Sequence, residues 1–159
     1  MRCRPFWKAA PAGAMAMLTA LLAGAAEDDM HVVMPADIKW VDNMSVPRGM
    51  QSMFVYGDPS KPGPFIFRAK FRPNYTLPPH RHPDDRTVTV ISGTYFSGIG
   101  ETFDPGRLKA FPPGSFYFVR GGVPHFSATR EGEVIIQESG AGPSSGIEYV
   151  HPEDDPRTH

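Results

Sequence analysis

Short apolar runs rich in β-branched and aromatic residues follow one another along the chain from residue 50 onward. Sixteen of the 18 prolines lie beyond residue 26, and they leave no room for a helical pattern of ordinary length. The pattern predicts an all-β protein, an antiparallel sandwich or barrel whose strands are joined by Gly, Pro and Asp turns. Seven strands are expected, at residues 50–57, 65–71, 86–92, 94–100, 115–119, 125–129 and 133–139.

The first 26 residues have the pattern of a secretory signal peptide. Arg2, Arg4 and Lys8 form a basic start, and an apolar run of small residues follows at 9–26. We expect cleavage before residue 26 or 27, and hence an exported protein that is periplasmic or secreted. The alternative is an uncleaved membrane anchor, for which a run of roughly 18 residues is barely long enough.

The remaining residues, 27–159, suit one domain with a single core. Its strands occupy about 50–140, preceded by an arm or edge strand and followed by a loop-rich tail. Cys3 is the only cysteine and lies in the signal segment, so the mature domain is expected to have neither a disulfide nor a thiol nucleophile. Its stability must therefore come from a packed core.

Charge and local motifs narrow the classes of partner. The formal net charge is −1, without long runs of like charge, so nucleic acid is not an expected partner. After signal cleavage no membrane segment is expected. The sequence has no P-loop, H-E-x-x-H or CxxC motif, which leaves nucleotide, zincin and thioredoxin chemistry without local support. A small-molecule ligand is the expected partner, and a homodimer is compatible with the sequence.

The stretch PPHRHP contains two histidines spaced one residue apart. In an extended strand, His80 and His82 project to the same face while Arg81 projects to the other. Two neutral imidazoles make up most of a facial metal site, and His125 in RGGVPHF offers a third. The alternative is a polar surface pair without function.

These two segments together resemble the two sequence motifs of the cupin superfamily. The first motif is matched by His80, His82 and Gly93; the second by Gly114, Gly122 and His125, with Arg120 where a proline is usual. The resemblance covers about residues 50–140, and the flanking text is similar to that of small exported single-domain cupins. It implies a jelly-roll barrel (double-stranded β-helix) of two antiparallel sheets. It also implies a divalent transition metal, Fe, Zn, Mn, Ni or Cu, at inward histidines.

The chain departs from the cupin pattern where that family carries its metal-binding Glu, because Arg86 stands there. A metal beside three neutral histidines and an inward arginine would create a costly cluster of positive charge. Three readings remain open. Asp84 or Asp85 could supply a carboxylate braced by Arg86, Arg86 could bind an anionic ligand, or metal affinity could be weakened or lost.

Other strand residues are weaker candidates for the site. Tyr117 could donate a hydrogen bond to a ligand, and Gln137 is a polar residue in an apolar strand that could line the barrel. Phe116 and Phe118 share one face of their strand and are candidates for an apolar pocket around the metal. Plain core packing or a surface position is the alternative for each.

The sequence thus predicts an exported metal-binding cupin that acts on, or binds, a small anionic or oxygen-containing molecule at a three-His centre. The resemblance admits dioxygenase, decarboxylase, isomerase and lyase chemistry, and the fold does not choose among them. The alternative is a non-catalytic cupin that binds a small ligand or a metal in the cell envelope.

Overall fold

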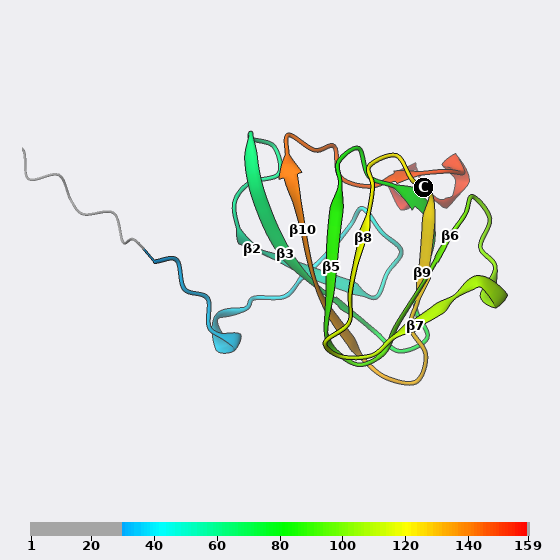
Figure 1. Ribbon diagram of the computed structural model, residues 1–159, viewed down its shortest axis with the longest axis horizontal. Coiled ribbons are helices and arrows are strands. Elements are labelled where there is room, and N and C mark those ends of the chain that lie inside the picture. The colour runs from blue at the N-terminus through cyan, green and yellow to red at the C-terminus, as the bar shows by residue number, and fades with distance from the viewer. Residues whose placement is uncertain (1–29, 159) are drawn as a thin grey trace, which may run out of the picture. The chain divides into compact units, whose positions relative to one another are not determined.

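The strands form two antiparallel sheets in a computed structural model that describes residues 30–158 (Figure 1). The six-stranded sheet has the order β1-β2-β3-β10-β5-β8, with β1 at Val41–Asp42, β2 at Met50–Tyr56, β3 at Gly63–Phe71, β10 at Val134–Gly142, β5 at Arg86–Ser92 and β8 at Phe116–Val119. The five-stranded sheet has the order β11-β4-β9-β6-β7, with β11 at Glu148–Tyr149, β4 at Thr76–Arg81, β9 at His125–Ala128, β6 at Tyr95–Ile99 and β7 at Lys109–Phe111.

Helical structure in the described residues is limited to four single turns of 3-10 helix. They lie at Pro35–Asp37, Pro105–Arg107, Pro152–Asp154 and Pro156–Thr158. Each begins with a proline, whose fixed φ suits the first position of a helical turn. The expectation of an all-β protein built from two antiparallel sheets is confirmed.

The seven expected strands correspond to β2, β3, β5, β6, β8, β9 and β10, and four further strands accompany them. The most consequential of the four is β4, which carries His80 and includes Pro78 and Pro79. A proline has no N–H to give to a ladder, which argues against a central strand. The pairing of β4 with β9 resolves this conflict by shifting register between Leu77 and His80, so the prolines fall at an irregularity.

Inward side chains change from apolar to polar along the strands. On β5, Val90 and Val88 are buried and are followed toward the strand start by buried Arg86. On the neighbouring β10, Ile136 lies beside Val90 in the ladder and Glu138 lies one inward position further along. The polar groups of adjacent strands therefore gather at one end of the interior. The rings of Phe71, Tyr75 and Tyr95 pack together in the apolar core.

All three glycines of the cupin-like motifs, Gly93, Gly114 and Gly122, occupy backbone conformations that favour glycine. Gly93 ends β5 with φ of 72°, and a Cβ there would overlap the Glu133 carbonyl. Gly122 has φ of 77° in the loop that leads into β9. Left-handed φ is costly for residues with a Cβ, so these glycines set the turns on which the motif histidines depend.

Residues His31–His159 form one unit, whereas the predicted signal peptide, residues 1–26, lies outside the described residues. Within residues 30–158 no helix has the length and apolar character needed to cross a membrane.

Candidate metal centre

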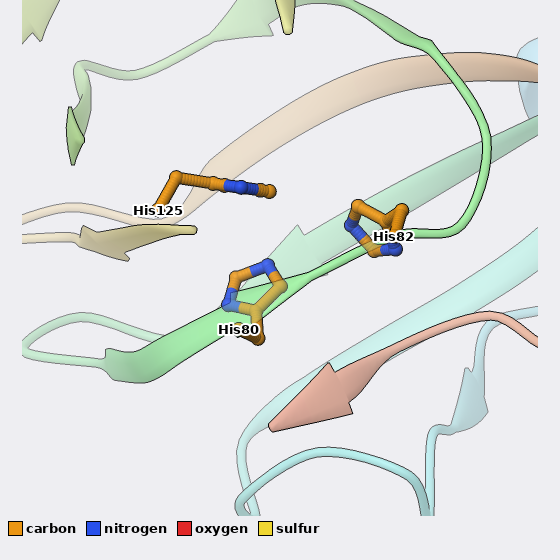
Figure 2. A group of neighbouring side chains, drawn as sticks. All are labelled: His80, His82 and His125. Atoms are coloured by element: carbon orange, nitrogen blue, oxygen red, sulfur yellow. The ribbon is translucent and has the colours of Figure 1, made fainter. Parts of the chain in front are cut away.

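Three histidines from two neighbouring strands converge on one space. His80 on β4 and His125 on β9 are direct partners in the ladder, and His82 follows β4 by one residue. One ring nitrogen from each lies within 4.8 Å of the others. Figure 2 shows the three rings turned toward a common point. The structure therefore brings together the three histidines on which the predicted metal site depends.

The second nitrogen of each ring is held by the backbone. His80 Nδ1 lies 2.8 Å from the Pro78 carbonyl, His82 Nδ1 lies 3.0 Å from the Gly146 carbonyl, and His125 Nδ1 lies 3.0 Å from the Val123 carbonyl. A carbonyl only accepts hydrogen bonds, so each Nδ1 must carry the proton and donate it. Each Nε2 is therefore left as an acceptor, which is the form that binds a metal ion.

The environment keeps the three imidazoles neutral. Burial lowers the pKa of His80 well below its usual value and lowers that of His125 as well. Burial also lowers the pKa of His82 to about 4, and the Arg86 charge acts in the same direction. A neutral imidazole is the ligating form, so no proton has to leave these rings near neutral pH before a metal binds.

Arg86 points into the interior and is enclosed by protein groups. Its Nη1 donates to Glu138 Oε1 at 2.9 Å, and its Nη2 donates to Asp84 Oδ1 and Ser144 Oγ, both at 3.1 Å. Its Nε lies 2.8 Å from Asp84 Oδ2, a close charge contact in which the N–H is not aligned on the oxygen. The Phe65 ring covers the guanidinium at 4.8 Å.

These contacts change the charge expected around a metal ion beside Arg86. Arg86 contributes one positive charge, and ionised Asp84 and Glu138 contribute two negative ones, so the cluster beside the histidines is net negative. All three guanidinium nitrogens already face protein acceptors. The contacts thus favour the reading in which Arg86 braces carboxylates over the reading in which it binds a ligand anion.

Neither of the two aspartates proposed from sequence belongs to the histidine group. Asp84 uses its oxygens on Arg86 and Ser144. Asp85 is exposed and accepts from the Gly121 N–H at 2.8 Å, which ties the turn after β4 to the loop before β9. Asp84 is thus an inner partner of Arg86, and Asp85 is a loop contact.

The carboxylate closest to the histidines comes from Glu138, which the sequence analysis missed. Its Oε1 lies 3.7 Å from His82 Nε2. Burial raises the pKa of Glu138, and the Arg86 charge opposes that shift. Gln137 was the residue selected from this strand, but it lies on the opposite face, where it accepts from Arg68 Nε at 3.2 Å. It is not among the residues that line the cavity.

The residues of β8 that face the interior are not the expected ones. Phe116 and Phe118 are 62% and 52% exposed on the outside, so the expectation that they line the metal pocket is wrong. Tyr117 and Val119 face inward instead and line the cavity. Burial raises the pKa of the Tyr117 hydroxyl well above its usual value, so this group is a neutral donor. Its ring packs on Phe111 at 4.8 Å.

The histidines open into a cavity of about 540 Å³. Its polar end carries the three histidines, Arg86 and Glu138, and its walls are mostly apolar, including Met50, Phe67, Phe71, Leu77, Val88, Tyr95 and Ile136. A mostly apolar cavity with a few convergent polar groups is typical of a small-molecule site. A second cavity, of about 390 Å³, shares Tyr117, Val119 and His125 with the first.

A jelly-roll barrel with such a site resembles several solved structures. The polyketide cyclase RemF from Streptomyces resistomycificus is 20% identical with a TM-score of 0.65, over 80% of this chain and 89% of that one. The DMSP lyase DddQ from Ruegeria pomeroyi DSS-3 is 15% identical with a TM-score of 0.61, over 74% of this chain and 64% of that one.

An RmlC-like cupin from Shewanella frigidimarina is 13% identical with a TM-score of 0.56, over 70% of this chain and 90% of that one. No family model and no curated protein matches the sequence. At these identities the likeness shows the fold. The chain has the cupin fold, as its two motifs predicted, and its three-His group fits a metal ion.

Proposed function

We propose that this protein is a metal-dependent cupin that binds a small oxygen-containing, anionic molecule beside its three-His centre and transforms it. The observation that carries the proposal is the orientation of the histidines. All three Nδ1 atoms are held by backbone carbonyls, which aims three neutral Nε2 atoms at one space. An arrangement that serves only core packing has no need of three such buried, converging acceptors.

The donor set and its charge support a divalent transition metal. Three imidazoles suit Zn, Fe, Mn, Ni or Cu and leave coordination positions open. The net negative charge of Asp84, Arg86 and Glu138 offsets part of the charge of a divalent ion. A positive charge remains overall, which favours a ligand with an anionic oxygen, such as a carboxylate or an enolate.

The residues around the centre supply the rest of the site. A bound metal would provide Lewis-acid polarisation of an oxygen atom of the ligand. Apolar side chains such as Phe67, Phe71 and Leu77 exclude water from the cavity, and Tyr117 offers a neutral hydroxyl at its wall. RemF and DddQ, which share the fold, are a cyclase and a lyase, so the reaction class of this chain is left to experiment.

Elemental analysis of protein purified without a His-tag tests the metal, and a screen of carboxylate and enolate compounds tests the activity. We expect one transition-metal ion per chain, together with turnover of one class of anionic compound. Bound metal with ligand binding but no turnover would support the alternative, a non-catalytic binder in the cell envelope. Protein that neither retains nor takes up metal would refute the metal-dependent function.

The proposed location is outside the cytoplasm, periplasmic or secreted. It is supported by the basic start and the apolar, small-residue run of residues 1–26. The only cysteine, Cys3, lies in the signal segment, so residues 27–159 carry no thiol that an oxidising compartment could modify.

A further inference from the structure

We propose that Glu138 on β10 supplies the carboxylate ligand of the metal centre. This inference rests on the proposed metal-dependent function. In the motif that the sequence resembles, the carboxylate stands at the position of Arg86 on β5. Here the carboxylate comes from the adjacent strand β10, and the arginine that occupies its usual place binds it.

The distance between Glu138 and His82 suits a shared metal ion, while Glu138 lies outside the group of three histidine nitrogens that are within 4.8 Å of one another. Glu138 Oε1 lies 3.7 Å from His82 Nε2, the nitrogen that the Gly146 contact leaves free. Metal–nitrogen and metal–oxygen bonds near 2.1 Å place two ligand atoms of one ion roughly 3 to 3.5 Å apart. A side-chain movement that brings Glu138 closer to His80 and His125 would therefore complete the coordination sphere.

Glu138 is oriented by a neighbouring residue, yet its carboxylate can still accept further contacts. Within residues 30–158 its carboxylate accepts one hydrogen bond, from Arg86 Nη1 on Oε1. A carboxylate has about four acceptor sites, so coordination capacity remains. Ligating carboxylates are themselves commonly fixed by hydrogen bonds, and Arg86 takes this role. It is in turn oriented by Asp84, Ser144 and the Phe65 ring.

Asp84 does not compete for the same role. Its Oδ1 accepts from Arg86 Nη2 and Ser144 Oγ, and its Oδ2 lies against Arg86 Nε. Glu138, by contrast, lines the cavity alongside the histidines, whereas Asp84 does not. The two acids carry the same charge and share Arg86, which makes Asp84 the matched control for Glu138.

The test compares Glu138→Gln with Asp84→Asn. Each variant removes one buried negative charge next to Arg86 and keeps the side-chain size. Affinity for Zn²⁺ is measured by competition with a chromophoric chelator, and the ligand field is measured from the visible absorption of Co²⁺-loaded protein. If Glu138 is a ligand, Glu138→Gln should weaken Zn²⁺ binding about 100-fold or more and change the Co²⁺ spectrum. Asp84→Asn should weaken it about tenfold with the spectrum intact.

Equal losses of affinity in the two variants, with unchanged Co²⁺ spectra, would overturn the inference and reduce Glu138 to a nearby charge. Glu138→Asp keeps the charge but shortens the side chain, so it should also lose affinity and alter the spectrum if a direct bond is made. It serves as the test if Glu138→Gln does not fold. If His80→Ala lost metal while Glu138→Gln kept full affinity, Glu138 would not be a ligand, and the metal-dependent function would still stand. Absence of Zn²⁺ binding in the unaltered protein would refute the metal-dependent function itself.

Discussion

His80 on β4 and His125 on β9 face each other directly in the ladder, with ring centroids 4.3 Å apart. One strand pairing thus joins two motifs that are far apart in the sequence. A slip of one residue would send one of the two rings to the opposite face of the sheet. The loops on either side secure the register, because the Gly122 N–H donates to the His82 carbonyl at 2.7 Å.

Replacing any one of His80, His82 and His125 by Ala should lower metal occupancy sharply. Each substitution removes one of three Nε2 donors that lie within 4.8 Å of one another. Inductively coupled plasma mass spectrometry of the purified variants measures the occupancy. His151→Ala is the matched control, because that exposed histidine bonds the Glu101 carbonyl and is not one of the three converging histidines. Occupancy equal to the unaltered protein in all three variants would show that these histidines are not ligands.

The metal-free protein should lose stability through His82 as the pH falls from about 7 to about 4. The pKa of His82 is lowered from 6.5 to about 4 in the folded protein. Between these two pH values His82 is protonated in the unfolded chain but stays neutral in the folded chain. The free energy of unfolding therefore decreases as the pH falls. The loss attributable to His82 is on the order of 3 kcal/mol.

Urea unfolding of chelator-treated protein across that pH range measures this loss, with His82→Gln as the comparison. Glu138 acts in the opposite direction, because its raised pKa makes the folded chain the first to take up its proton as the pH falls. Because Glu138 lies 3.7 Å from His82 Nε2, the comparison reports His82 together with its coupling to Glu138. A pH dependence as steep in His82→Gln as in the unaltered protein would contradict the assignment to His82.

Arg86→Met should destabilise the fold by about 3 to 5 kcal/mol, because it leaves buried Asp84 and Glu138 without their positive partner. Chemical unfolding of the metal-free protein measures the change. Arg120→Met removes an exposed arginine of the same size and should change the stability by less than about 0.5 kcal/mol. Similar losses in the two variants would mean that the buried pairs contribute little.

Gly140→Ala should disturb the Arg86 cluster from the backbone side. A Cβ at Gly140 would overlap Asp84 Oδ2 and lie 2.8 Å from Phe65 Cζ. We expect a loss of about 1 to 3 kcal/mol in unfolding free energy together with weaker metal binding. Gly132→Ala, where a Cβ meets nothing within 4 Å, is the control. If Gly140→Ala behaved like Gly132→Ala, the packing around Asp84 would have to be looser than described.

Export should leave a mature chain that starts near residue 26 or 27. The basic start and apolar run of residues 1–26 are the basis of this prediction. Intact-mass measurement of protein recovered from the cell envelope or the medium checks it. Retention of Met1 in that material would contradict signal cleavage.

The fold and the three histidines could be predicted from the sequence because their signals are local. HRH fixes two rings on one strand face, and the glycines at 93 and 122 set turns that only a few conformations satisfy. The alternation along β5 likewise placed Arg86 on the same face as Val88 and Val90, which are buried with it.

The surroundings of Arg86 were not predictable in the same way. Val134, Ile135 and Ile136 are apolar on both faces of β10, so the alternation does not reveal which of Gln137 and Glu138 points inward. Residues distant in sequence complete the site, since Ser144 and the Gly146 carbonyl come from the tail expected to be a loop. Such long-range contacts leave no periodic signal in a single sequence.

Tyr117, Val119 and His125 line both cavities, so these side chains lie between the two spaces. Replacing Val119 by Ala should enlarge the space between the two cavities beside the three-His group. A substitution at position 119 would therefore change the space open to a ligand without altering any of the three histidines.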